Sequence, residues 1–297
     1  MTRAKEYKKH GIGILKSLES QLDANKGYPE EPTWGYAFSL LAALENNSDL
    51  SSNDFAKIAL KHYCEQEKDI KSFSWEFTTY ALFRAEKLSG STDLAKLSNL
   101  NEKGTRMVNW TLLRQLNRLN AEKKQFRAKF ILRCIRKIFT SDEGQIFDEL
   151  NTKSLQYHAF CLFILAELDA MGYQTLVRDW LIRGCQFSKK MMLKSGMSLY
   201  IGRGQEQIFG YASLIYALEY AEKYCGLART SHLETIWNYL AKFQRSDGSY
   251  PLVLNLNSPE KPMANYARDK PAGWLGYNTL YDYQPFLAYC LLRASKL

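Results

Sequence analysis

A recurring turn constrains the fold of this chain more than any other feature. Each copy places a glycine, followed shortly by an aromatic residue, between two helical stretches, and the clearest three are centred on Gly144, Gly196 and Gly248. These glycines are 52 and again 52 residues apart (196 − 144 and 248 − 196). A fixed period near fifty is typical of stacked helical hairpins. An earlier copy surrounds Gly27, which leaves room for shorter repeats before Gly144.

The helical stretches are of two kinds. Those that follow the turns, from about residues 34, 75, 155, 209 and 284, are apolar on nearly every side, which is typical of buried helices. Those that precede the turns, at about 4–22, 53–67, 121–139, 173–193 and 229–244, carry a charged face and are expected outside. A weaker pair fits between residues 91 and 120. We therefore predict an all-α fold, an (α/α)6 toroid of six helical hairpins with inner and outer helix rings, formed by residues 1–297 as one domain.

The charge balance limits the possible partners. Lys and Arg total 40 and Asp and Glu total 31, so the formal net charge is +9, and such a field attracts nucleic acid, an anionic membrane or an acidic polysaccharide. The densest basic run, 123–137, alternates with apolar residues at helical spacing, as in a solvated helix face. Because no zinc-finger, RNP or basic-zipper pattern accompanies it, we expect no nucleic-acid partner.

Other classes of protein are disfavoured by what the chain does not contain. No run of about 18 apolar residues occurs, so no membrane span is predicted. The six cysteines form no CxxC pair and the four histidines show no metal-ligand spacing, so we predict neither a disulfide framework nor a metal or cofactor. The basic start, 1–9, has no apolar segment after it, so we expect a cytoplasmic protein, or a periplasmic or secreted one if a leader has been removed.

Short motifs add a resemblance to known families. Residues 200–211 (YIGRGQEQIFGY) resemble segments of toroidal glycoside hydrolases and polysaccharide lyases, which also carry a tyrosine–histidine pair on an inner helix, as Tyr157 and His158 do here. Residues 242–250 (KFQRSDGSY) are similar to the glutamine–aromatic turns of toroidal terpene cyclases. The acidic DxDD and DDxxD motifs of those cyclases are absent, as is the Asp/Cys/His zinc set of protein prenyltransferases. The resemblance therefore implies a carbohydrate-active enzyme first and an isoprenoid enzyme second.

Five residues are candidates for catalysis. Asp148, Glu206 and Asp282 stand near the starts of predicted inner helices, where carboxyl groups could act as acid, base or nucleophile on a glycosidic bond. Tyr157 and His158 could move a proton in a β-elimination. Structural roles stay open for three of them, because Asp282 also suits a helix cap, His158 a buried core position, and Asp148, with Glu149, an exposed loop charge.

Candidates for substrate binding are aromatic platforms for sugar rings and polar side chains. The aromatic ones are Trp34, Tyr36, Trp75, Tyr200, Tyr211, Trp274 and Tyr277. The polar ones are Glu76, Glu149, Arg203, Gln205 and Gln207. Glycines on both sides of Arg203 free the backbone before a helix start, so its guanidinium and the helix amides could bind an anionic oxygen such as a uronate carboxylate. Arg203 could instead form a local ion pair with Glu206.

Together these features predict an enzyme that cleaves a polysaccharide or oligosaccharide, with an acidic, uronate-containing glycan favoured. Hydrolysis is preferred because carboxylates occur at several inner-helix starts, and β-elimination by a lyase would use overlapping residues. A role in bacterial surface-polysaccharide or exopolysaccharide metabolism fits an enzyme without a leader. Two alternatives stay open: a toroid that binds glycans without cleaving them, and an isoprenoid cyclase-like enzyme.

Overall fold

The computed structural model describes residues 2–66, 74–98, 105–150, 152–254 and 279–297, and within these ranges it contains eleven α-helices and no strand. Six helices form an inner set: α2 (Gly35–Asn46), α4 (Ser74–Ser89), α5 (Val108–Asn120), α7 (Leu155–Ala170), α9 (Ile208–Tyr224) and α11 (Leu280–Ala294). Five form an outer set: α1 (Arg3–Gln21), α3 (Asp54–Glu65), α6 (Gln125–Ile138), α8 (Gln174–Met191) and α10 (His232–Ala241).

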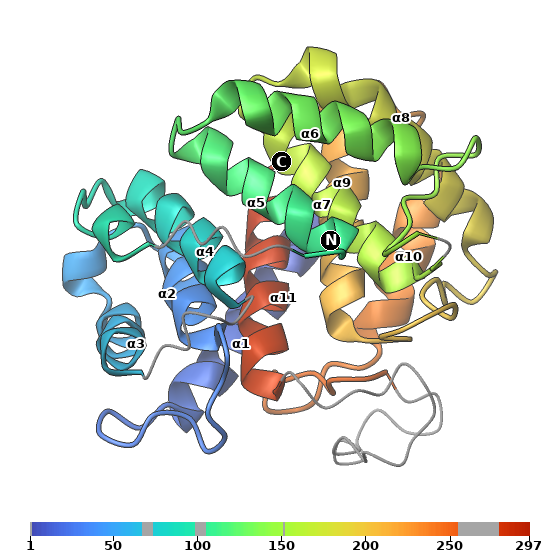
Figure 1. The fold of residues 1–297 in the computed structure, drawn as a ribbon. Helices are drawn as coiled ribbons and strands as arrows, with labels where there is room; N and C mark the ends of the chain where they lie inside the picture. The colour runs from blue at the N-terminus through green and yellow to red at the C-terminus, as the bar shows by residue number, and fades with distance from the viewer. Residues whose placement is uncertain (1, 67–73, 99–104, 151, 255–278) are drawn as a thin grey trace.

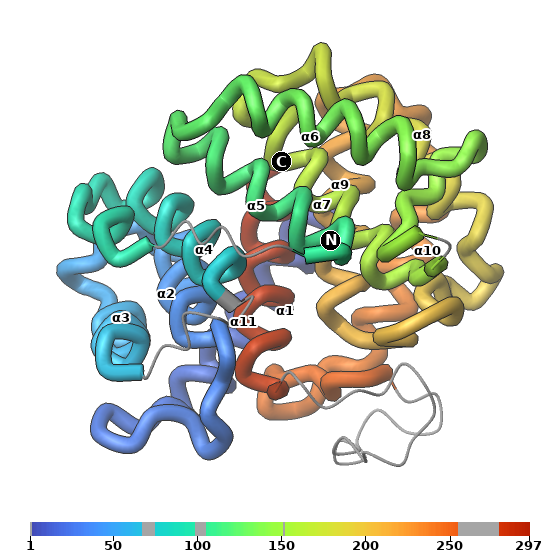
Figure 2. The backbone as a smooth tube through the Cα atoms, viewed as in Figure 1, coloured from blue at the N-terminus to red at the C-terminus, as the bar shows by residue number. Residues whose placement is uncertain are grey.

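The inner helices close into a ring. Each contacts the next in the order α2, α4, α5, α7, α9 and α11, and α11 contacts α2 again. The outer helices pack against this ring, α3 on α2, α6 on α5, α8 on α7 and α10 on α9. Figure 1 shows α11, in red, beside the blue α1 and α2, so the two ends of the chain meet where the ring closes. The tube in Figure 2 follows the chain as it alternates between outer and inner positions. The predicted all-α toroid is confirmed.

The weaker hairpin differs from the other five. Its inner helix is α5, but within the described residues 91–98 its outer position holds only the 3₁₀ turn η2 (Ala95–Leu97). The physical reason is a shortage of apolar surface, because Leu94 is the one large apolar side chain of this segment that is buried, whereas Leu97 is exposed. A single buried side chain cannot hold a helix of several turns against the ring.

Aromatic side chains fill the centre of the ring. Five inner helices contribute buried phenylalanines: Phe38, Phe77, Phe209 and Phe286 from α2, α4, α9 and α11, and both Phe160 and Phe163 from α7. The Phe77 and Phe160 rings are stacked with centroids 5.2 Å apart, and Phe209 and Phe286 lie 4.7 Å apart. Such pairs add to the free energy gained from burial alone. Because the centre is filled, a substrate can reach the ring only at one of its two ends.

One end of the ring is held together by a buried glutamate. Glu167 of α7 accepts hydrogen bonds from the hydroxyls of Tyr80 and Tyr216 and from Nε of Arg293, which come from α4, α9 and α11. Burial acts to raise the pKa of Glu167, but Arg293 and Arg84 outweigh it, so the pKa lies below its ordinary value. The carboxylate therefore stays charged and links four inner helices, and the dipole at the C-terminal end of α11 favours Arg293.

The seam of the ring depends on a close approach between α2 and the start of α11. A Cβ atom on Gly35 would lie 2.0 Å from the carbonyl oxygen of Tyr281, which belongs to the backbone and cannot turn away. Asp282 strengthens the same seam, because its Oδ1 accepts from the backbone N–H of Trp34 at 2.8 Å and its Oδ2 from that of Thr279 at 3.1 Å. The second bond belongs to a capping box that begins α11.

We expect Gly35→Ala to lower the free energy of unfolding by roughly 2–3 kcal/mol, because the added methyl group overpacks the seam. Gly13→Ala is the matched control, since its Cβ would meet Nε2 of Gln244, the far end of a flexible side chain, at 2.8 Å. Urea unfolding of both variants measures the difference. Equal stability of the two variants would contradict this account of the seam.

Candidate functional site

Residues from three inner-helix starts meet at one end of the ring, in a cluster that we define as Arg203, Asp148, Tyr157 and Asn109. Arg203 donates a hydrogen bond to Oδ2 of Asp148, and Nδ2 of Asn109 donates to Oδ1 at 2.8 Å. The carbon at the centre of the guanidinium lies 5.2 Å from the centre of the Tyr157 ring. Three predicted site residues, 55 and 46 positions apart along the chain (203 − 148 and 203 − 157), are thus brought together.

The backbone around the cluster explains why Arg203 can reach Asp148. Gly202 and Gly204 both have positive φ, +84° and +73°, and a Cβ on Gly202 would lie 2.2 Å from the carbonyl oxygen of Lys153. Only glycine therefore lets this turn lie against the start of α7. There Ser154 caps α7 by accepting from the N–H of Tyr157, and its hydroxyl donates to the Arg203 carbonyl at 2.9 Å.

The cluster presents a cation to solvent over a buried anion. Asp148 is fully buried, and burial raises the pKa of its carboxyl group against the opposing effect of Arg203. The side chain of Arg203 is 31% exposed and carries the charge that the buried carboxylate orients. An exposed guanidinium held over an aromatic ring can bind a carboxylate or a sugar hydroxyl through its outer N–H groups.

Tryptophans near the starts of α2, α4 and α5 have unequal exposure. Trp34 is buried and stacks on Phe77 at 4.7 Å, and Trp75 is also buried. Trp110, which sequence reasoning missed, is half-buried and meets the edge of Phe77 at 5.1 Å. It directly follows Asn109 of the cluster. Its signal, a tryptophan at an inner-helix start, was hidden because the repeat is weakest in this hairpin.

Two of the predicted carboxylates form contacts within the scaffold. Glu76 accepts from Nε of Arg114 at 2.6 Å across α4 and α5, and burial raises the pKa of its carboxyl group despite that arginine. Glu206 faces α10 rather than the ring, because its carboxylate accepts from the hydroxyls of Tyr211 and Tyr239 at 2.7–2.8 Å and from the N–H of Leu199 at 3.1 Å. It pairs with these groups and not with Arg203, the ion pair considered from the sequence.

His158 lies between α7 and α8, next to the cluster in sequence but buried. Its Nδ1 accepts from the N–H of Ile146 at 3.0 Å, so its proton is on Nε2, which donates to the carbonyl of Gly184 at 3.1 Å. Burial lowers the pKa of His158 to about 4. The neutral ring therefore joins a turn to two helices, which is the structural role considered for it.

The remaining predicted residues occupy separate positions. Tyr36 donates to Glu31 outside the ring, Tyr200 donates to the Met191 carbonyl, and Gln207 is buried and accepts from Gln156. Glu149 and Gln205 are half-buried, and Glu149 adjoins Asp148 in the sequence. Trp274 and Tyr277 lie outside the described residues.

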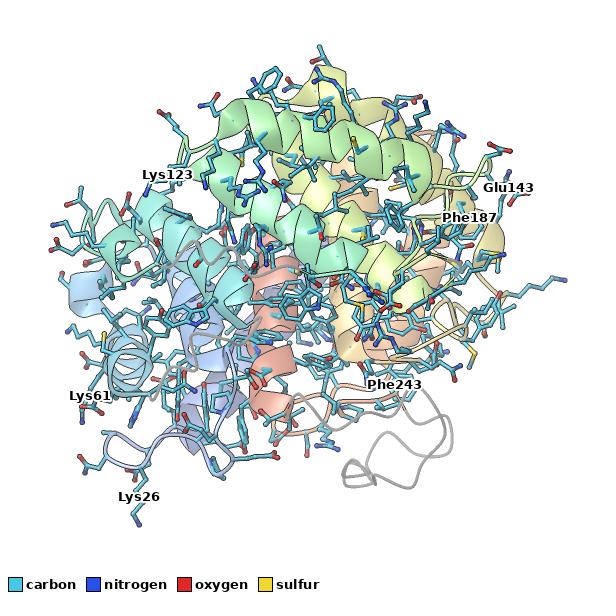
Figure 3. All side chains as sticks on the ribbon, in the orientation of Figure 1. Lys26, Lys61, Lys123, Glu143, Phe187 and Phe243 are labelled. Carbon is cyan, nitrogen blue, oxygen red and sulfur yellow. The ribbon has the colours of Figure 1, made fainter. Side chains whose placement is uncertain are left out.

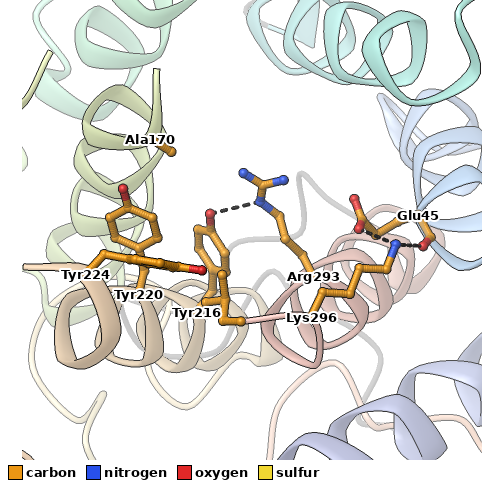
Figure 4. Close-up of a pocket in the computed structure, with 8 residues that line it drawn as sticks. Glu45, Ala170, Tyr216, Tyr220, Tyr224, Arg293 and Lys296 are labelled. Carbon is orange, nitrogen blue, oxygen red and sulfur yellow. Dashed lines mark hydrogen bonds and ion pairs between the residues drawn. The ribbon is translucent and has the colours of Figure 1, made fainter. Parts of the chain in front are cut away.

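A cavity of about 330 Å³ lies at the opposite end of the ring, near the C-terminal ends of α2, α7, α9 and α11 (Figure 4). Three tyrosines of α9 form one side of it, namely Tyr216, Tyr220 and Tyr224. Its charged side chains serve the protein itself: Arg293 binds Glu167, and Lys296 pairs with Glu45 at 2.8 Å. This cavity therefore contributes to the scaffold, and the Arg203 cluster is the stronger candidate site.

The described part of the chain offers no group of three or more His, Cys, Asp and Glu side chains that could hold a metal ion. No helix within the same ranges is both long enough and apolar enough to cross a bilayer.

No family model and no curated protein matches the sequence. Solved structures are similar over nearly the whole chain. A polysaccharide lyase has a TM-score of 0.65 and 14% identity, with 99% of this chain and 98% of that one covered. Cellobiose 2-epimerase from Bacillus thermoamylovorans has a TM-score of 0.68 and 13% identity, with 99% and 100% covered. An inactive variant of an α-1,6-mannanase from a Salegentibacter species, in complex with mannotriose, has a TM-score of 0.65 and 11% identity, with 97% and 99% covered. The predicted resemblance to α/α-toroid carbohydrate-active enzymes is confirmed at the level of the fold.

Acid should weaken the fold through His158. The unfolded histidine has a pKa near 6.5 and the folded one near 4, so the unfolded state binds more protons between these values and stability is lost as pH falls through them. The expected loss is about 3 kcal/mol. We expect His158→Asn, whose Oδ1 can still accept from Ile146, to be less stable at neutral pH but to lack this loss. Urea unfolding of both proteins at pH 7 and about pH 4.5 measures how the free energy of unfolding changes with pH in each. An equal change in the two proteins would contradict the assignment.

Asp282→Asn should separate a capping role from a catalytic one. Asparagine keeps one oxygen acceptor, but its NH2 group then faces the second backbone N–H donor. We therefore expect the free energy of unfolding to fall by about 1–2 kcal/mol. Turnover of a glycan substrate should change little. Asp49→Asn, at the exposed cap of η1 (Leu50–Ser52), is the control and should cost less. Unchanged stability together with lost turnover would make Asp282 catalytic.

Proposed function

We propose that this protein binds an acidic glycan at the Arg203 cluster and cleaves it there. The observation that carries the proposal is the partly exposed guanidinium of Arg203, held over Tyr157 by a fully buried aspartate. A uronate carboxylate offers two oxygens in one plane, which matches the planar N–H donors of arginine. The toroids similar to this chain include enzymes named for cleaving polysaccharide and mannan, which supports a glycan as the substrate.

The arrangement of carboxylates bears on the reaction. Glycoside hydrolases of the common type hold two carboxyl groups about 5–9.5 Å apart around the scissile bond. Here Glu76, Glu206 and Asp282 are each bound to scaffold groups away from Arg203. Asp148 is the carboxylate that faces the guanidinium, and it is buried beneath it. Glu149, half-buried and next to Asp148 in the sequence, is a described carboxylate that a hydrolase could use beside it. Because Asp148 itself is held beneath Arg203, we favour β-elimination, whereas the sequence alone favoured hydrolysis.

The proposed reaction is an elimination at a uronate unit of the glycan. Arg203 neutralises the uronate carboxylate and so acidifies the neighbouring C–H bond. A base removes that proton, the electron pair forms a carbon–carbon double bond, and the adjacent glycosidic C–O bond breaks. The leaving oxygen then takes a proton. We assign the proton exchange to Tyr157, whose ring lies against the guanidinium, and the positioning of Arg203 to Asp148 with Asn109.

Arg203→Lys tests the proposal. Lysine keeps the charge but loses the planar fork, so we expect kcat/KM on uronate polymers to fall on the order of a hundredfold. Arg3→Lys is the matched control, because the Arg3 side chain is also 31% exposed and also paired with a carboxylate, that of Glu219. Products are followed by the ultraviolet absorbance of unsaturated uronate and by new reducing ends.

The outcomes separate the candidate functions. Unsaturated product that depends on Arg203 supports elimination. New reducing ends without unsaturated uronate would show that the protein hydrolyses the glycan instead. Oligosaccharide binding without any product would show that it is a glycan-binding toroid. Full activity of the Arg203→Lys variant would contradict the assignment of the cluster.

A further inference from the structure

The outer helix α6 exposes large apolar side chains that the fold does not use. Phe126 is 85% exposed, Phe130 57% and Ile138 56%. The opposite face of α6 is already anchored, because Ala128, Leu132 and Ile135 are buried where the helix packs on α5 and α8. Phenylalanines turned to water on a helix that is otherwise well packed indicate a surface that meets something else.

The same helix is strongly basic. Residues 123–141 contain seven lysines and arginines and no Asp or Glu. Two of the cations have partners on neighbouring elements: Arg136 pairs with Asp179 of α8, and Lys129 lies over the ring of Tyr173. The acidic residues closest in sequence, Glu122, Asp142 and Glu143, lie beyond the two ends of α6. The outer side of α6 therefore joins exposed phenylalanines with exposed cations, among them Arg133 and Lys137.

The exposed residues follow the turns of the helix. Phe126, Phe130, Arg133 and Lys137 recur at intervals of four, three and four residues, so they share one face. Figure 1 shows α6 at the outer edge of the molecule, and Figure 3 shows Lys123, just before it, pointing outward. We call the face formed by Phe126, Phe130, Arg133 and Lys137 the α6 face; Ile138 is also exposed but lies to one side of it.

We propose that the α6 face docks the protein on an anionic lipid bilayer, lying in the plane of its surface. Basic side chains are drawn to anionic headgroups, while the two phenylalanines gain free energy by entering the boundary with the acyl chains. Both features are needed for such an interfacial helix and both are present. The proposal stands independently of the glycan site.

Other occupants fit less well. A second copy of the chain would place the same cluster of cations opposite itself in a two-fold dimer, and like charges repel. Single-stranded nucleic acid is bound in a basic groove that tracks its backbone, whereas α6 is a convex outer helix. An acidic polysaccharide would use the cations but has no need of the exposed phenylalanines.

Vesicle co-sedimentation of the full chain at roughly 0.15 M ionic strength tests the proposal. Wild type should sediment with vesicles of phosphatidylcholine and phosphatidylglycerol and much less with phosphatidylcholine alone. Phe126→Ser with Phe130→Ser should weaken binding on the order of tenfold, and Arg133→Gln with Lys137→Gln on the order of fivefold for each cation removed. All these side chains are exposed, so thermal unfolding should be unchanged.

Matched variants control for surface chemistry elsewhere. Leu193→Ser removes an exposed apolar side chain and Lys26→Gln an exposed cation, and Figure 3 shows Lys26 at the bottom of the molecule, well below Lys123. Both should bind vesicles as wild type does. Failure of wild type to bind the anionic vesicles would overturn the proposal. The proposal would also be overturned if the protein bound an oligonucleotide or a polyuronate more tightly than the vesicles, and if the Phe126→Ser, Phe130→Ser variant kept that binding.

Discussion

Packing of phenylalanines from five inner helices is the constraint on which the rest of the toroid depends. Phe38, Phe77, Phe160, Phe209 and Phe286 meet at the centre, and each contributes about 1.5–3 kcal/mol by its burial. The contacts hold only if the six inner helices close the ring, which in turn requires the tight seam at Gly35. A filled centre leaves the two ends of the ring as the places where polar chemistry can gather.

The two ends differ because the inner helices present opposite termini there. C-terminal ends favour cations, and there Glu167 collects Arg84 and Arg293 in a cluster that serves stability. N-terminal ends favour anions, and there Asp148 and Asp282 accept hydrogen bonds from side chains and helix starts. Arg203 enters the second end from a glycine turn rather than from a helix, which is why a cation can be exposed at that end.

The sequence predicted the fold well because repeats and apolar periodicity are local properties. Helices that are apolar on all sides proved to be inner helices, and within the described residues 91–98, where one large apolar side chain is buried, the outer position holds η2. The site was predicted less completely. Arg203, Asp148 and Tyr157 were each named, but the contact between Arg203 and Asp148 spans 55 positions and leaves no local trace. Nor does a local pattern distinguish a carboxylate bound by two tyrosines, as Glu206 is, from one that faces substrate.

Aromatic side chains occupy three different environments in this toroid. At the centre, phenylalanines are buried on all sides and act only through packing. At the end of the ring Tyr157 is nearly buried, and its ring supports a guanidinium. On α6, Phe126 and both of its neighbours in the sequence are exposed, so its side chain remains in water. The toroids similar to this chain share its fold at 11–14% identity while their names indicate different reactions, so the inner packing defines the scaffold and the side chains at its ends and outer surface define what the protein does.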